Sequence, residues 1–179
     1  MEKLFLNISF IGGIHGVGKS TICKSICADL NIEYLSASEV LKWVEINEDS
    51  QEKKVQNIAL TQNRLIKGLQ NRVEKEHHYL LDGHYCLLDN SEKIIKVPFE
   101  TFQAINPSTL HLIVSDITEI KSRLELRDKR IYDYSLLKNM QDQEIEYAKE
   151  LSHKLNIDLT IGQQDNYCQI LDALKLKVL

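Results

Sequence analysis

The sequence has 179 residues, of which 43% are hydrophobic and 27% are charged, and its net charge is −4. These values predict one globular domain and exclude a disordered or collagen-like chain. The acidic balance, without a basic stripe, argues against nucleic acid as a partner. No run of about 20 apolar residues predicts a membrane span, and the first apolar run is too short and too interrupted for a signal peptide.

The cysteine pattern indicates a reducing compartment. The four cysteines form no CxxC pair, and no histidine stands near them at the spacing of a metal site. We therefore expect reduced thiols that pack as small apolar side chains, and a cytoplasmic location. The residues concerned are Cys23, Cys27, Cys86 and Cys168.

The predicted elements alternate between strands and helices along the whole chain. Apolar runs predict strands, and apolar residues at a period of 3.6 predict helices. Strands are expected at about 6–11, 32–36, 78–82, 109–114 and 158–161, with a hairpin between 85 and 97. Helices are expected at about 19–30, 36–46, 49–75, 116–127, 135–155 and 166–176, with a helical turn after Pro98. This order predicts a parallel sheet with helices on both faces.

A complete GxxxxGKS motif follows the first predicted strand and opens the first predicted helix. Its glycines let successive backbone N–H groups point at phosphate oxygens, and the helix adds the positive end of its dipole. Lys19 would reach the β and γ phosphates, and the Ser20 hydroxyl would bind Mg²⁺. The motif therefore predicts binding of a purine nucleoside triphosphate, Mg·ATP. The expected ATP-binding residues are Gly13, His15, Gly16, Val17, Gly18, Lys19, Ser20 and Thr21.

A carboxylate ends the third strand of the predicted sheet. Ligands gather at the carboxyl edge of an open parallel sheet, so Asp82 is the expected second metal ligand beside Ser20. An Asp that merely ends a strand before Gly83 is the alternative. Asp116 is a rival metal ligand, although its predicted place at a helix N-cap explains it without a function.

Three arginines follow the fourth strand at spacings of i, i+4 and i+7. If the helix continues, Arg123, Arg127 and Arg130 lie on one face near the carboxyl edge. Their guanidinium groups would stabilise the charge that develops on a transferring phosphoryl group, so we assign them a catalytic role together with Lys19. The alternative is that they form surface ion pairs with neighbouring carboxylates such as Asp128.

With these motifs, the chain resembles the P-loop nucleoside monophosphate kinases, most closely the archaeal-type adenylate kinases and related bacterial ATP-binding proteins. The likeness spans nearly the whole chain. It rests on the P-loop, on Leu80-Leu81-Asp82-Gly83-His84, on Ile105-Asn106-Pro107 and on the arginine cluster.

The resemblance implies a three-layer α/β P-loop NTPase fold with a five-stranded parallel sheet in the order 2-3-1-4-5. Residues 1–179 would form a single domain with a monophosphate-binding insertion at about 36–77 and a short lid at about 127–134. It implies that ATP and AMP react to give two ADP, with Mg²⁺ as cofactor. Archaeal-type relatives form trimers, which leaves a homo-oligomer open for this chain.

The resemblance also indicates an acceptor site. Ser38 and Lys42 fall where these enzymes begin the monophosphate-binding helix, and Lys42 replaces the usual arginine. After Asp82-Gly83 ordinary adenylate kinases carry an arginine, whereas this chain has His84-Tyr85-Cys86. His84 matches the archaeal-type pattern, and a turn histidine with a local hydrogen bond is the alternative. Gln62 interrupts the apolar stripe of its helix and would contact the acceptor, although a partly exposed helix face is the alternative for Gln62, as it is for Glu144 on a later helix.

Two other functions remain open at this stage. A small-molecule kinase on the same fold would explain the departures at Lys42 and Cys86. A regulatory ATP-binding switch or ATPase would instead act through a protein partner and would need no small acceptor.

Overall fold

The computed structural model describes residues 7–41, 58–89 and 91–178. Its centre is a five-stranded sheet in which every neighbouring pair of strands is parallel. The strands, in their order across the sheet, are β2 (Glu33–Ser36), β3 (Tyr79–Asp82), β1 (Ile8–Gly12), β6 (Thr109–Val114) and β7 (Leu159–Gln163).

The strand order agrees with the expected fold once the hairpin is set apart. Strands β4 (Cys86–Leu88) and β5 (Ile94–Lys96) form a separate antiparallel pair, which we predicted as a hairpin between residues 85 and 97. Because these two strands are counted, the order reads 2-3-1-6-7 in place of the predicted 2-3-1-4-5. When only the five strands of the main sheet are numbered, their order is 2-3-1-4-5, as predicted.

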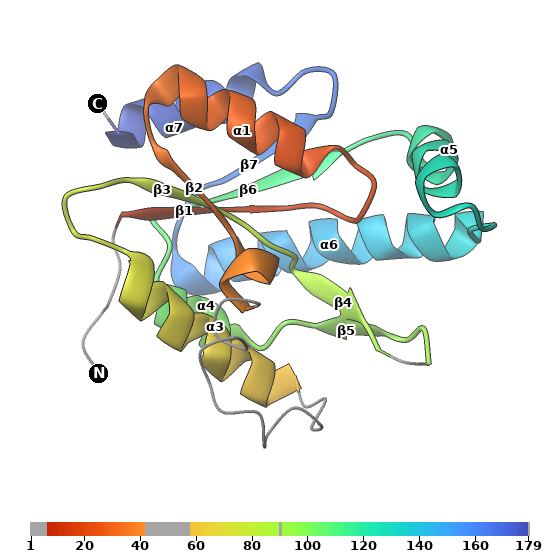
Figure 1. The fold of residues 1–179 in the computed structure, drawn as a ribbon, viewed down its shortest axis with the longest axis horizontal. Helices are drawn as coiled ribbons and strands as arrows, with labels where there is room; N and C mark the ends of the chain where they lie inside the picture. The colour runs from red at the N-terminus through yellow and green to blue at the C-terminus, as the bar shows by residue number, and fades with distance from the viewer. Residues whose placement is uncertain (1–6, 42–57, 90, 179) are drawn as a thin grey trace.

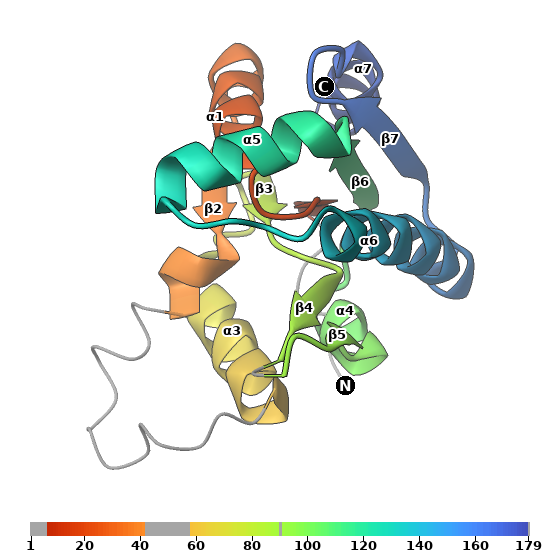
Figure 2. The same ribbon diagram turned by 90° about the vertical axis from the view of Figure 1, so that its right-hand side faces the viewer.

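Helices cover both faces of the sheet, as Figure 1 shows. One layer holds α1 (Lys19–Leu30) and α7 (Cys168–Val178), and the opposite layer holds α3 (Ile58–Arg72), α4 (Phe99–Ile105) and α6 (Tyr134–Leu155). Figure 2 looks onto the remaining edge, where α5 (Ile117–Asp128) lies between α1 above and the hairpin below. None of the described helices has the length and apolar character that a bilayer span requires.

The central strand explains why two cores form. All five residues of β1 are buried, as in parallel strands that are covered on both faces. Phe10 packs into the core under α3, α4 and α6, while its neighbour Ile11 packs into the core under α1 and α7. Alternate side chains point to opposite faces of a strand, so one apolar run supplies both cores.

Two predicted helices are described only in part. Ser36 ends β2 and residues 37–41 are helical, while the remainder of the predicted helix at 36–46, with Lys42, lies outside the described residues. Of the helix predicted over 49–75, residues 49–57 lie outside the described residues, and the described helix α3 runs from Ile58 to Arg72. The insertion at about 36–77 and the lid at about 127–134 therefore stay predictions.

Candidate phosphate-binding site

The GxxxxGKS loop has the backbone shape that phosphate binding requires. Gly13, Gly16 and Gly18 have φ values of 148°, 81° and 90°, which side chains rarely adopt. Helix α1 begins at Lys19, and no side chain caps its N-terminus at Gly18. The first N–H groups of a helix need a partner, so those of α1 are available to a phosphate group.

Gly16 also lets α5 approach the loop closely. A Cβ atom at Gly16 would lie 2.7 Å from Cγ of Leu124, whereas one at Gly18 would lie 3.4 Å from the flexible side chain of Gln164. Both positions have a left-handed φ, but only Gly16 is pressed against a buried core residue. Because Gly16 has no side chain, the loop can pack directly against Leu124 of α5.

We expect Gly16→Ala to lower both stability and Mg·ATP affinity more than Gly18→Ala does. Each variant strains a left-handed backbone, at a cost of about 1–3 kcal/mol, and Gly16→Ala adds the clash with Leu124. Urea unfolding and calorimetric titration with Mg·ATP would measure the two effects. Equal losses in the two variants would mean that contact with Leu124 does not restrict Gly16.

A buried ion pair joins the loop to the end of β3. Nζ of Lys19 lies 2.6 Å from Oδ1 of Asp82, and both side chains are more than nine-tenths buried. The Ser20 hydroxyl donates to Oδ2 of Asp82 at 3.3 Å, and the Tyr34 hydroxyl donates to the same oxygen at 3.0 Å. The carboxylate thus has three donors from α1 and β2.

The residues present fit a magnesium ion that arrives with a nucleotide. Ser20 and Asp82 bring two oxygen ligands together, which suits a hard cation that completes its shell with water and phosphate oxygens. Among the described residues, no group of three or more His, Cys, Asp or Glu side chains could hold a metal ion alone. Asp116, the rival ligand, caps α5 by accepting from the N–H groups of Thr118 and Glu119, which confirms its predicted N-cap position.

One histidine lies within the loop and another lies beside it, and the pKa of each is lowered. Nδ1 of His84 lies 2.8 Å from the carbonyl oxygen of Gly13, and because a carbonyl only accepts, Nδ1 carries the hydrogen. Burial and the nearby Lys19 place the pKa of His84 well below its usual value. The ring of His15 lies 4.3 Å from that of His84, and desolvation, Lys19 and Arg127 lower its pKa as well. Positive charge in the loop is therefore concentrated on Lys19.

The three arginines do not share one helical face. Helix α5 ends at Asp128, close to the predicted end at about residue 127, and Lys129 follows with a left-handed φ of 53°, so the condition that the helix continues to Arg130 is not met. The reason is the C-cap at Lys129, whose N–H bonds to the carbonyl of Glu125. Arg130 instead stacks over the ring of Tyr132, with 4.5 Å between the guanidinium carbon and the ring centroid.

Arg123 and Arg127 differ in what they contact. Arg123 donates to the carbonyl of Gly16 at 3.4 Å and to the side chain of Gln164 at 3.1 Å, so it links the loop to the segment after β7. It also pairs with Glu119 at 3.1 Å. Arg127 forms a two-pronged pair with Asp128, at 2.6 and 2.8 Å. The ion pairs that we weighed as an alternative are therefore present, alongside contacts to the loop.

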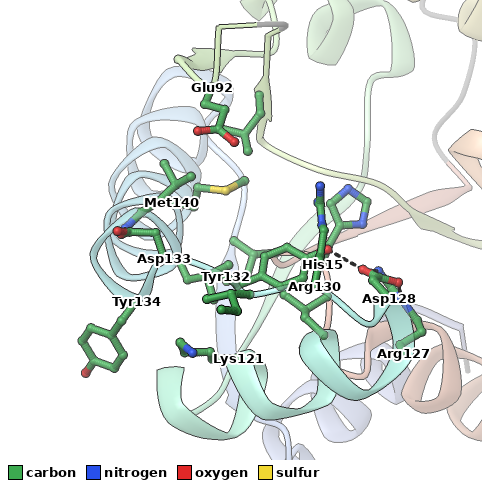
Figure 3. Close-up of a pocket in the computed structure, with 16 residues that line it drawn as sticks. His15, Glu92, Lys121, Arg127, Asp128, Arg130, Tyr132, Asp133, Tyr134 and Met140 are labelled. Carbon is green, nitrogen blue, oxygen red and sulfur yellow. Dashed lines mark hydrogen bonds and ion pairs between the residues drawn. The ribbon is translucent and has the colours of Figure 1, made fainter.

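Three cavities meet at the loop. A pocket of about 300 Å³ lies over Lys19, Ser20 and Thr21, with Arg123 and Arg127 on its wall. A second, of about 750 Å³, lies between the loop, α5, α6 and the hairpin. Figure 3 shows this second pocket, with His15 and Arg130 on one side and Glu92 of the hairpin at the far end.

The third cavity, of about 410 Å³, lies on the other side of Lys19 and has an apolar floor. It contains the predicted acceptor residues Ser38, Gln62, Asp82 and His84. Gln62 is only 8% exposed, so the alternative of a partly exposed helix face is wrong for it. We refer to this cavity as the acceptor cleft.

A family model described as an AAA domain matches residues 12–159, which is most of the chain. The chain belongs to the AAA domain family. The matched span includes the loop, Asp82 and all three arginines, and it confirms the predicted resemblance to the P-loop kinase superfamily. The closeness to archaeal-type adenylate kinases stays a prediction. No curated protein matches the sequence.

Solved structures resemble this AAA-family chain over nearly its whole length. An uncharacterized protein from Eubacterium ventriosum ATCC 27560 has a TM-score of 0.51 at 14% identity, with 97% of this chain and 98% of that chain covered. A gluconokinase from Sinorhizobium meliloti 1021 has a TM-score of 0.48 at 11% identity, with 98% of this chain and 90% of that chain covered. At these identities the first likeness concerns the fold alone.

Sequence reasoning missed several residues of this AAA-family site. Tyr34 binds the Asp82 carboxylate, but nothing in a short strand distinguishes it from a packing residue. The floor of the acceptor cleft, formed by Phe10, Phe102 and Leu65, also went unrecognised. These residues come from three separate elements, so only the folded chain brings them together.

Proposed function

We propose that this AAA-family protein transfers the γ-phosphoryl group of Mg·ATP to a small acceptor in the acceptor cleft, and that the acceptor is a nucleoside monophosphate such as AMP. One observation carries the proposal. Lys19 and Ser20 line both the 300 Å³ pocket over the loop and the acceptor cleft. Donor phosphates and acceptor would therefore meet at Lys19.

The residues of the loop would hold the donor for transfer. Backbone N–H groups of residues 13–20 would bind the phosphates, and the Lys19 ammonium would leave Asp82 to contact the β and γ phosphates. Ser20 and Asp82 would hold Mg²⁺, which neutralises charge on the phosphates when it is bound. Transfer of this kind depends on position and charge, and it needs no covalent intermediate.

The acceptor cleft combines an apolar floor with polar side chains. The rings of Phe10 and Phe102, 2% and 0% exposed, pack edge to face behind this floor, with 5.2 Å between their centroids. Polar side chains of Gln62, Thr61 and Thr101 line the same cleft and would bond to the edge of a base. This combination supports a nucleotide acceptor.

A second candidate is a small neutral acceptor that is phosphorylated on a hydroxyl group. Among the described residues that line the cleft, Lys19 is the one lysine or arginine, so an acceptor phosphate would need a cation from elsewhere. A hydroxyl acceptor needs a base instead. The neutral His84, with its hydrogen on Nδ1, leaves Nε2 as a proton acceptor.

An acceptor screen tests both candidates. Purified protein is incubated with Mg·ATP and each common nucleoside monophosphate, and separately with a panel of neutral polyols and sugars, before chromatography of the products. We expect a diphosphate from AMP, and its formation to be slower by about 10²- to 10³-fold in a Lys19→Met sample prepared in the same way. A phosphorylated polyol without any diphosphate would favour the second candidate. Acceptor-independent hydrolysis alone would favour the ATPase switch and contradict both.

A further inference from the structure

Helix α6 binds the backbone of three separate segments through side chains spaced three residues apart. Gln141 both donates to and accepts from the backbone of Ser115, at 3.0 and 3.1 Å. Tyr147 donates its hydroxyl hydrogen to the carbonyl of Val97 at 2.6 Å. Glu144, between them, binds the segment that follows the Asp82 strand. One face of α6 therefore fixes the segments that follow β6, β3 and β5.

Glu144 has the most unusual position of the three. Its side chain is completely buried, and Oε1 accepts hydrogen bonds from the N–H groups of Tyr85 and Cys86, both at 2.9 Å. The other oxygen, Oε2, has no hydrogen-bond partner among the described residues. The alternative of a partly exposed helix face is therefore wrong for Glu144. A buried polar group of this kind is costly and needs an explanation.

The carboxyl group also lies against the start of the phosphate-binding loop. A Cβ atom at Gly12 would lie 3.1 Å from Oε2 of Glu144 and 2.3 Å from the ring of Tyr85. Gly12 is the last residue of β1, directly before the loop. Glu144 thus lies against the end of β1 and binds the segment that follows β3. It reaches both from α6, a helix that is adjacent to neither strand in the sequence.

The pKa of Glu144 depends both on its burial and on the neighbouring loop. Burial raises the pKa of Glu144 to about 7, while the Cys86 N–H group and the Lys19 ammonium lower it. The N–H groups of Tyr85 and Gly13 act in the same direction as Lys19. The carboxyl group is therefore within electrostatic reach of the residue that would hold the phosphates.

Two further bonds connect the same two strand ends. The N–H group of Gly83 donates to the carbonyl of Ile11 at 3.0 Å, and Nδ1 of His84 donates to the carbonyl of Gly13 at 2.8 Å. Asp82 and His84 precede the residues that Glu144 binds by one to four positions. A shift of the Tyr85 and Cys86 backbone would therefore move both of these side chains relative to Lys19.

We propose that Glu144 is a positioning residue for phosphoryl transfer: from α6 it fixes the backbone carrying Asp82 and His84 against the start of the phosphate-binding loop. The inference rests on the proposed function. In this role the position of the accepting Oε1 atom matters more than the charge of the carboxylate. A misplacement of about 1 Å can reduce the rate of such a reaction by about 100-fold.

Two substitutions separate the location of the acceptor from its charge. Glu144→Gln keeps an oxygen at Oε1 and removes the charge, whereas Glu144→Asp keeps the charge and withdraws the oxygen by one methylene group. We expect Glu144→Asp to lower kcat by about 10- to 100-fold with a smaller change in the KM for ATP. Glu144→Gln should keep kcat within about threefold of the wild type.

Ser152→Ala is the matched control, because it removes a hydrogen bond from α6 to the backbone of Ile157, and neither residue lines any of the three cavities. We expect it to lower the melting temperature and leave kcat unchanged. Circular dichroism would confirm that every variant is folded at the assay temperature. An inactive Glu144→Gln beside an active Glu144→Asp would overturn the proposal in favour of a charge or proton role, and so would full activity of both.

Hydrogen exchange separates this inference from the proposed function. In Glu144→Asp, and not in Ser152→Ala, the amides of Tyr85 and Cys86 should exchange faster, and affinity for a non-hydrolysable ATP analogue should fall. Neither measurement needs an acceptor. If the wild type phosphorylates nothing, the proposed function fails while these readouts still judge Glu144. Unchanged exchange and unchanged affinity in Glu144→Asp would overturn the positioning role.

Discussion

Replacing Lys19 with methionine is expected to reduce phosphoryl transfer by about 10²- to 10³-fold, since the loss of one preorganised donor to a developing charge has an effect of that size. The variant should remain folded but less stable. Methionine preserves most of the side-chain volume, yet it leaves the buried Asp82 carboxylate without its cation, and breaking a buried pair costs up to about 3–5 kcal/mol. Ser20 and Tyr34 still donate to Asp82 and reduce that cost.

Stability and catalysis can be separated at this position with a second substitution. In the double variant Lys19→Met with Asp82→Asn, no unpaired charge stays buried, so the free energy of unfolding should recover relative to Lys19→Met alone. Turnover should not recover. Lys149→Met, which changes an exposed lysine of α6, serves as the control for loss of charge. Recovery of turnover in the double variant would contradict the role given to Lys19.

Arg127→Ala is expected to lower kcat by about 10³-fold and to change affinity for ATP far less, because in the proposed reaction Arg127 would act on charge that develops during transfer. Its side chain is 60% exposed and lines two of the three cavities. An exposed ion pair such as that with Asp128 contributes little to stability. The melting temperature should therefore stay close to that of the wild type.

Asp128→Asn and Arg72→Ala distinguish a catalytic arginine from a structural one. Asp128→Asn breaks the same pair and leaves the guanidinium free to reach a phosphate, so activity should persist. Arg72→Ala removes an exposed arginine at the end of α3, away from the cavities. Steady-state kinetics and ATP titration would measure all three variants. Equal losses in kcat and in ATP affinity for Arg127→Ala would indicate ground-state binding instead.

The parts of the site that the sequence predicts are those whose chemistry is local. The loop at residues 13–20 carries its own backbone geometry in its glycines, and Asp82 is placed by the end of its apolar strand. The parallel sheet follows in the same way, from the alternation of strands and helices, whereas its strand order was implied by the family resemblance. In these cases the residues that allow the prediction are the same residues that form the predicted structure.

The parts that the sequence does not predict depend on distant segments. Glu144 looks like a misplaced polar residue until the backbone of Tyr85 and Cys86 is seen beside it, 59 and 58 positions earlier in the chain. The shared face of the three arginines is a different case. The sequence predicted the end of this helix at about residue 127, and α5 ends at Asp128, so Arg130 lies beyond the helix.

The length of α6 has a mechanical consequence. Glu144 lies ten residues after Tyr134, where the helix begins at the end of the predicted lid, and ten residues of helix measure about 15 Å. A tilt of roughly 10° about the point where Glu144 is anchored would therefore displace that end by about 2.5 Å. Because the predicted lid at 127–134 leads directly into α6, a movement of that segment would reach, through the helix, the strand ends that Glu144 binds.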